Sequence, residues 1–134
     1  MESSFVIISA CLPFLDSYQN HVRTCELRQE LLDKGIPFDG LSQVRNGKTE
    51  ASFIVVTSSP NPYLPLAQKF GQKSVLFRDK AHTCQEVFVA KDTPKKELGK
   101  VVASTETLAK KAEFHLCVQD VSCMRYFTLE QGVN

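Results

Sequence analysis

Two carboxylates stand directly at the start of apolar, strand-like runs of the sequence, and this placement is the first sign of chemistry. Glu50 precedes the run 51–56, and Glu86 opens the run 86–90. Strands that lie side by side would bring both carboxylates to one cleft, where they could bind a cation or a ribose diol. The alternative is that each carboxylate is only a solvated strand end. Sequence position leaves both interpretations open.

Five further side chains are candidates for contact with a ligand. Ser9 and Ala10 end the first apolar run, where small residues would either let a ligand approach the backbone or simply fit a tight core. Gln72 follows a glycine and is either an amide at a pocket edge or an exposed residue after a helix end. Phe14 and Tyr63 lie in loop-like segments, where an aromatic ring either stacks on a flat base or anchors the loop by packing.

Familiar enzyme and metal-binding motifs are absent from the sequence. There is no Walker loop and no G-x-G-x-x-G, G-x-S-x-G or H-E-x-x-H pattern. The five cysteines form no C-x-x-C pair and the histidines are far apart, so we predict no metal site and no cofactor. An odd number of cysteines is most simply a set of free thiols in a reducing compartment.

Length and charge limit the class of function. The 134 residues fit a single domain, residues 1–134, and 16 basic against 15 acidic side chains leave a net charge of +1. This near-neutral charge does not indicate the basic face of a nucleic-acid binder. The apolar run 5–15 contains Pro13 and is shorter than the roughly 20 residues of a membrane span. The polar N-terminus does not resemble a signal peptide, so we expect a cytoplasmic protein that binds neither nucleic acid nor membrane.

The hydrophobic pattern predicts several strands and two helices. The predicted strands are residues 5–11, 38–44, 51–57, 74–77, 86–90, 101–102, 114–118 and 125–129, and the predicted helices are residues 17–34 and 62–70. Asn46-Gly47 is a strong signal for a hairpin turn. Residues 91–100 are charged and contain Pro94 and Gly99, so we expect a mobile surface loop there. Residues 105–111 have only weak helical character.

The order strand, helix, strand, strand, helix, strand is typical of the split-βαβ, ferredoxin-like fold. We therefore predict an α+β domain with an antiparallel sheet, both helices on one face, and a C-terminal β-hairpin appended to it. The other face would carry apolar side chains such as Phe53, Val75 and Phe88 and would need a cover. Self-association would provide one, because closed rings of such domains are common.

The opening run Phe5-Val6-Ile7-Ile8-Ser9-Ala10 resembles the first strand of the bacteriophage S-adenosylmethionine lyases, formerly called SAM hydrolases. Glu50-Ala51 before a strand, the strand at 75–76, the run 87–90 and the hairpin 114–129 are similar in the same order. The resemblance covers nearly the whole chain. The segments 50–53 and 70–76 also resemble an uncharacterised bacterial domain family, which has no known activity and therefore implies none for this chain.

The lyase resemblance implies a PII-like homotrimer that binds S-adenosylmethionine between subunits. It implies cleavage to methylthioadenosine and homoserine lactone by attack of the substrate's own carboxylate, without metal or water as nucleophile. Glu50 matches a site glutamate of that family, and Glu86 matches a second by position. Preorganised carboxylates would balance the sulfonium and ammonium charges of the substrate.

The chain departs from the lyase pattern at one position. The family's site tyrosine falls in a region that reads Phe38-Asp39 here. A phenyl ring keeps stacking or cation–π contact with a sulfonium, but it cannot donate a hydrogen bond. The predicted site therefore comprises Glu50 and Glu86 as catalytic residues. Its predicted ligand contacts are Ser9, Ala10, Phe38 and Gln72.

Three functions are compatible with this sequence. The first is a phage-encoded lyase in the host cytoplasm, which would deplete the methyl donor and blunt host restriction. The second is a non-catalytic binder that sequesters an adenosine-containing ligand or nucleotide signal, and the missing tyrosine favours it. The third is a protein–protein inhibitor, in which the polar residues at the strand ends form no ligand site.

Overall fold

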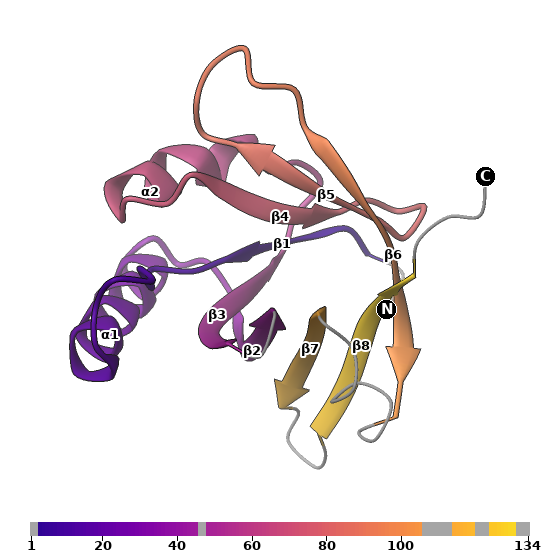
Figure 1. The fold of residues 1–134 in the computed structure, drawn as a ribbon. Coiled ribbons are helices and arrows are strands. Elements are labelled where there is room, and N and C mark those ends of the chain that lie inside the picture. The colour runs from indigo at the N-terminus through magenta and orange to yellow at the C-terminus, as the bar shows by residue number, and fades with distance from the viewer. Residues whose placement is uncertain (1–2, 46–47, 106–113, 120–123, 131–134) are drawn as a thin grey trace.

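Strands dominate the part of the chain that the computed structural model describes, which is residues 3–45, 48–105, 114–119 and 124–130. The strands are β1 (Phe5–Ile8), β2 (Asp39–Arg45), β3 (Lys48–Val56), β4 (Ser74–Arg78), β5 (Thr83–Phe88), β6 (Lys96–Ser104), β7 (Phe114–Gln119) and β8 (Met124–Glu130). The helices are α1 (Ser17–Asp33), the 3-10 turn η1 (Asn61–Tyr63) and α2 (Leu64–Lys69). All pairings are antiparallel, and the strands form a closed barrel in the order β1-β3-β2-β7-β8-β6-β5-β4 (Figure 1).

The prediction of an open ferredoxin-like sheet, and of the PII-like architecture that goes with it, is wrong. Strands β4, β1, β3 and β2 are neighbours in that order, but β5, β6, β8 and β7 continue the sheet until it closes. The error arises in residues 91–100, which were expected to form a loop. Lys96–Ser104 is instead a strand that pairs with β5 on one side and β8 on the other.

An irregular register explains why the sequence of β6 does not show the two-residue alternation of a strand. Leu98 and Val101 both pack with the side chains inside the barrel, although strict alternation would put residues three apart on opposite faces. The pairing of β5 with β6 shifts between Cys84 and Gln85, which is the signature of a β-bulge. The bulge breaks the two-residue period, so the strand reads as a charged loop. The weak helical prediction for 105–111 falls almost entirely on 106–113, outside the described residues.

The inside of the barrel is filled by apolar side chains from every strand. Phe5, Ile7, Leu41, Ile54, Leu76, Cys84, Val101 and Leu116 form this interior cluster, with Leu98 and Phe127 packed against it. An eight-stranded barrel is just wide enough for side chains to fill it. The chain thus buries within itself the sheet face that points away from the helices, so the physical reason given above for a ring of copies does not hold. Phe53 and Val75, which were expected on that face, lie on the helix side instead.

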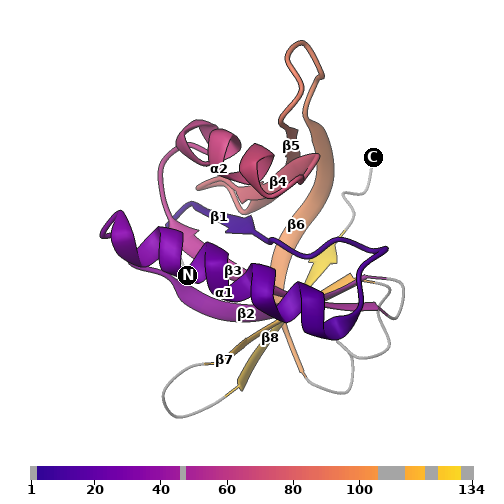
Figure 2. The same ribbon diagram turned by 90° about the vertical axis from the view of Figure 1, so that its left-hand side faces the viewer.

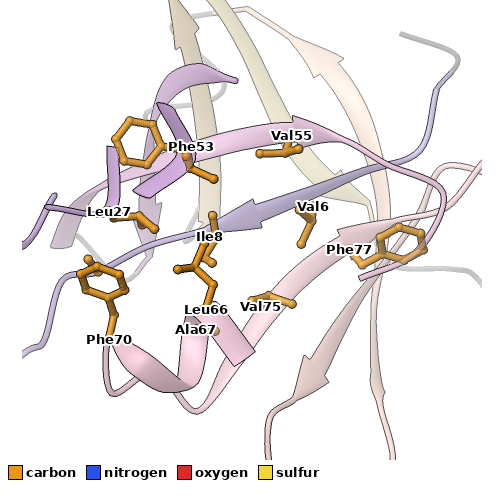
Figure 3. Close-up of a cluster of buried hydrophobic side chains, with 12 residues drawn as sticks. Val6, Ile8, Leu27, Phe53, Val55, Leu66, Ala67, Phe70, Val75 and Phe77 are labelled. Carbon is orange, nitrogen blue, oxygen red and sulfur yellow. The ribbon is translucent and has the colours of Figure 1, made fainter. Parts of the chain in front are cut away.

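A second core lies outside the barrel, between the helices and the wall formed by β1, β3 and β4 (Figures 2 and 3). The strands contribute Val6, Ile8, Phe53, Val55, Val75 and Phe77, and the helices contribute Leu27, Leu31, Leu66, Ala67 and Phe70. Helix α1 begins with a capping box in which Asp16 accepts from the Gln19 backbone and Gln19 reaches back. Its buried residues, Leu27 and Leu31, lie one turn apart and face the sheet.

Polar side chains of α1 fasten the helices to each other and to the end of β1. Arg23 donates from Nε to the Ala10 carbonyl at 2.7 Å and from Nη2 to the Phe70 carbonyl at the end of α2. Glu30 accepts from Lys34 at 3.2 Å and also from Lys69 of α2. Both lysines lower the pKa of Glu30, chiefly through these hydrogen bonds.

A buried guanidinium, that of Arg78, lies at the end of the barrel where β1 begins. Arg78 is 3% exposed and lies 4.8 Å from the centre of the Phe5 ring. It donates to the Ser3 carbonyl, and its Nη1 lies 3.3 Å from His82 Nδ1. Burial lowers the pKa of this side chain. Arg78 thus fixes the N-terminal segment against the turn between β4 and β5.

In the described part of the chain, no helix is long and apolar enough to cross a membrane.

The two adjacent valines of β3 give a matched test of the helix-side core. Val55 is 2% exposed and Val56 is 65% exposed. Val55→Ala should lower the free energy of unfolding by about 2 kcal/mol, because it removes buried methyl groups and leaves a cavity. Val56→Ala should change it by less than about 0.5 kcal/mol. Urea denaturation measures both, and equal effects would contradict this packing.

Glu30 should make stability depend on pH in a defined direction. Its pKa is lower in the folded chain than in the unfolded chain, so its contribution is present above the ordinary carboxyl value and is lost as pH falls through the folded value. Glu30→Gln should therefore lower the melting temperature at about pH 7, and it should lower it less as the pH falls below the ordinary carboxyl pKa. Glu26→Gln, an exposed glutamate of the same helix, is the control and should leave the melting temperature unchanged.

Candidate functional site

At one end of the barrel the inward-facing side chains change from apolar to polar. On β3, Ile54 belongs to the interior cluster, and Ser52 and Glu50 follow on the same face at two-residue steps. Beside β3, Ser9 directly follows β1 and stands two residues beyond Ile7, another member of that cluster. The apolar filling therefore stops before this mouth of the barrel, and polar groups replace it.

The same change occurs on the other strands around this mouth. On β2, Gln43 follows the interior residue Leu41, and its Nε2 donates to Ser52 Oγ at 2.7 Å. On β4, Ser74 precedes the interior residue Leu76 by two positions, and Glu86 of β5 is paired opposite Leu76. Ser74 Oγ donates to Glu86 Oε2 at 2.6 Å. The mouth thus carries two serine–glutamate pairs, from β1 with β3 and from β4 with β5.

Ser9 holds the Glu50 carboxylate in place. Its hydroxyl donates to Glu50 Oε1 at 2.6 Å, with the Ala51 carbonyl as a second acceptor at 3.2 Å, and it accepts from the Cys11 backbone at 3.0 Å. Ser9 is buried and Glu50 is half-buried. Because the donor is itself fixed by the backbone, the carboxylate is preorganised and needs little rearrangement to meet a ligand.

A cleft of about 970 Å³ opens beside these groups. Its lining residues are Cys11, Leu12, Pro13, Phe14, Asn20, Gln43, Lys48, Thr49, Glu50, Gly71, Gln72, Lys73 and Ser74. They come from the β1–α1 loop, helix α1, the β2–β3 hairpin, the α2–β4 turn and the start of β4. One wall is apolar, the rim carries two lysines, and Glu50 is the only carboxylate among these lining residues.

Two amide side chains fix the walls of this cleft. Gln72 Nε2 donates to the Cys11 carbonyl at 2.8 Å and joins the α2–β4 turn to the β1–α1 loop. Asn20 of α1 accepts from the Leu12 backbone at 2.8 Å and donates to the Leu12 carbonyl at 3.1 Å. Both amides therefore position backbone rather than stand idle at a pocket edge.

The predicted site residues separate into two groups. Glu50 and Gln72 line the cleft, Ser9 supports Glu50, and Glu86 reaches the mouth through Ser74 without being a lining residue. Two predicted ligand contacts lie in the helix-side core. The Ala10 side chain is buried there, and Phe38 packs edge-to-face on Phe53, with ring centres 5.1 Å apart.

Sequence reasoning missed the polar residues that complete the mouth. Gln43 and Ser74 carry no motif, and neither do the exposed lysines Lys48 and Lys73. The available signal was the two-residue period on strands, which puts Gln43 on the face of Leu41. That signal becomes useful only once the barrel shows which face is inside.

The chemistry of the cleft suits an organic cation rather than a metal ion. Among the described residues, no three histidine, cysteine or carboxylate side chains gather in one place. A single half-buried carboxylate beside an apolar wall is complementary to one positive group on a larger ligand, since charge-assisted hydrogen bonds are strongest where water is partly excluded. The rim lysines favour a ligand that also carries negative charge.

The two serines of the mouth, Ser9 and Ser74, differ in the number of hydrogen bonds that their hydroxyls make. Ser9→Ala removes a donor to Glu50 and leaves the Cys11 backbone amide without this acceptor, so unfolding free energy should fall by about 1–3 kcal/mol. Ser74→Ala removes a single hydrogen bond to Glu86 and should cost about 1 kcal/mol. Urea denaturation of both variants makes the comparison. A smaller loss for Ser9→Ala than for Ser74→Ala would contradict the supporting role of Ser9.

Comparison with known proteins assigns no family to the chain. No protein family matches the sequence, and no curated protein matches it significantly.

Proposed function

We propose that this protein binds S-adenosylmethionine in the cleft at the barrel mouth and cleaves it to methylthioadenosine and homoserine lactone. The observation that carries the proposal is the half-buried Glu50 carboxylate, held by Ser9 beside an apolar wall. In the sequence resemblance to the phage lyases, Glu50 is also the residue that matches a site glutamate. A cleft of about 970 Å³ is large enough for a nucleoside joined to an amino acid.

The reaction needs no group from the protein to enter the bond changes. The substrate's carboxylate oxygen attacks its own γ-carbon, the C–S bond breaks, and the bonding electron pair goes to sulfur. The sulfonium becomes a neutral thioether, and the carboxylate becomes the ester of the lactone. Two opposite charges disappear, so the protein contributes by holding the cyclising conformer and by excluding water.

This charge balance assigns an orientation to the ligand. A carboxylate beside the sulfonium would stabilise the substrate more than the transition state, in which the positive charge is fading, and would slow the reaction. The ammonium keeps its charge throughout, so it is the better partner for Glu50. The sulfonium then faces the apolar side chains of Leu12 and Pro13, where low polarity favours loss of charge.

Sequestration of an adenosine-containing ligand without cleavage is the second candidate. The observation that favours it is Phe38, which packs on Phe53 in the helix-side core and is not a lining residue of the cleft. The hydroxyl expected of a lyase is thus missing at this position, and its ring is occupied by packing. Binding without turnover would follow if that hydroxyl is essential.

Incubation with S-adenosylmethionine and mass spectrometry of the products tests the proposal. Methylthioadenosine and homoserine lactone should accumulate. Glu50→Gln should weaken binding of the substrate by roughly 10- to 100-fold, the loss of one charge-assisted hydrogen bond. Glu86→Gln should have a smaller effect, because Glu86 acts only through Ser74. Glu97→Gln changes an exposed carboxylate of β6 and is the control.

Three results would decide between the candidates. Binding without product at high protein concentration would replace cleavage by sequestration. Absence of both binding and product would remove both functions. Unchanged affinity in Glu50→Gln would show that the ligand lies elsewhere. The homotrimer implied by the resemblance stays a prediction, and light scattering would then give three times the 15.0 kDa of one chain.

A further inference from the structure

The structure separates the two aromatic rings that the sequence offers for stacking. Tyr63 packs against the helix-side core, so its ring serves as an anchor for the loop. Phe14 is 79% exposed and is a lining residue of the cleft. A phenyl ring left in water at the edge of a cleft is a costly placement that a ligand could relieve.

The backbone presents Phe14 in a fixed position. Leu15 N–H donates to the Leu12 carbonyl at 3.2 Å, which closes a β-turn with Pro13 and Phe14 as its central residues. Proline is favoured at the first central position because its ring presets φ. Asn20 of α1 holds both ends of the turn, through Leu12 at 2.8 and 3.1 Å and through the Leu15 carbonyl at 3.4 Å.

Three independent hydrogen-bonding groups thus build a rigid tip around an unburied ring. The turn is closed by its own backbone, fixed from α1 by Asn20, and joined to the α2–β4 turn by Gln72, which donates to the Cys11 carbonyl at 2.8 Å. A ring on such a tip loses little conformational freedom when a ligand binds, so contact with it yields more affinity than contact with a mobile side chain.

We infer that Phe14 is a stacking platform for the flat heteroaromatic ring of the ligand and sets the specificity of the cleft for a nucleoside. This inference rests on the proposed function and adds the residue that reads the base. Glu50 of β3 binds the cationic end of the same ligand, while Leu12 and Pro13 line the cleft from the same loop as Phe14. Glu50 and Phe14 thus recognise two different parts of the ligand, the ammonium group and the base.

Two partial ligands test the two ends separately. S-Methylmethionine has the ammonium, the sulfonium and the carboxylate but no ring, whereas adenosine has the ring but no charge. Phe14→Ala should weaken binding of S-adenosylmethionine and adenosine by roughly 10- to 100-fold, the usual effect of removing one aromatic platform. It should leave the affinity for S-methylmethionine unchanged. Glu50→Gln should do the reverse for the two partial ligands.

Tyr18→Ala is the matched control, because Tyr18 is 74% exposed on α1 but is not a lining residue of the cleft. It should bind all three ligands like the unaltered chain. The sequence contains no tryptophan, so Phe14→Trp introduces a single fluorophore whose emission adenosine should quench by stacking. Thermal denaturation of each variant confirms that it is folded.

The outcomes distinguish this inference from the proposed function. If S-adenosylmethionine is cleaved and Phe14→Ala binds it normally, the stacking role is wrong and the function stands. If adenosine binds and quenches Phe14→Trp but S-adenosylmethionine is not cleaved, the stacking role stands and the lyase activity is wrong. If Phe14→Ala weakens S-methylmethionine as strongly as adenosine, the residue shapes the whole cleft and the ring-specific role is overturned.

Discussion

The burial of strand β1 on both faces is the constraint on which the rest of this structure depends. Its four residues pair with β3 on one side and β4 on the other. Phe5 and Ile7 point into the barrel, while Val6 and Ile8 point to the helices. A strand buried in this way needs a cover on both faces, because leaving either face in water would forfeit the hydrophobic stabilisation. The barrel interior covers one face and the helices cover the other.

The candidate site begins where this double burial ends. The residue after β1 is Ser9, and its hydroxyl organises the Glu50 carboxylate instead of filling the interior. The helical layer reaches the same place, since Arg23 and Asn20 of α1 bind the backbone of the segment that follows β1. The loop that carries Phe14 thus leaves directly from a strand buried on both faces, and Glu50 lies on the strand paired with it, so both side chains are attached to firmly packed elements.

Elements that depend on interactions between residues close in the sequence were predicted well, and those that depend on distant partners were not. Helix α1 begins and ends close to its predicted limits because the cap at Asp16 and the left-handed Gly35 are local signals. The hairpin of β2 and β3 followed from Asn46-Gly47. Glu50 was chosen for its place before an apolar run, and it lies in β3 and lines the cleft. Of strand β6 only residues 101–102 were predicted, because a bulge that depends on its partner β5 disrupts its two-residue period.

The sequence by itself determined the strong local elements, the near-neutral charge, and the two glutamates that deserve a test. Only the tertiary structure decided that the sheet closes, that Ala10 and Phe38 pack in the helix-side core, and that Phe14 rather than Tyr63 lies at the cleft. The physical reason is that a strand's two faces are equivalent in sequence until distant partners make one of them the inside. Closure of the barrel makes that choice, and with it selects which polar residues meet at the mouth.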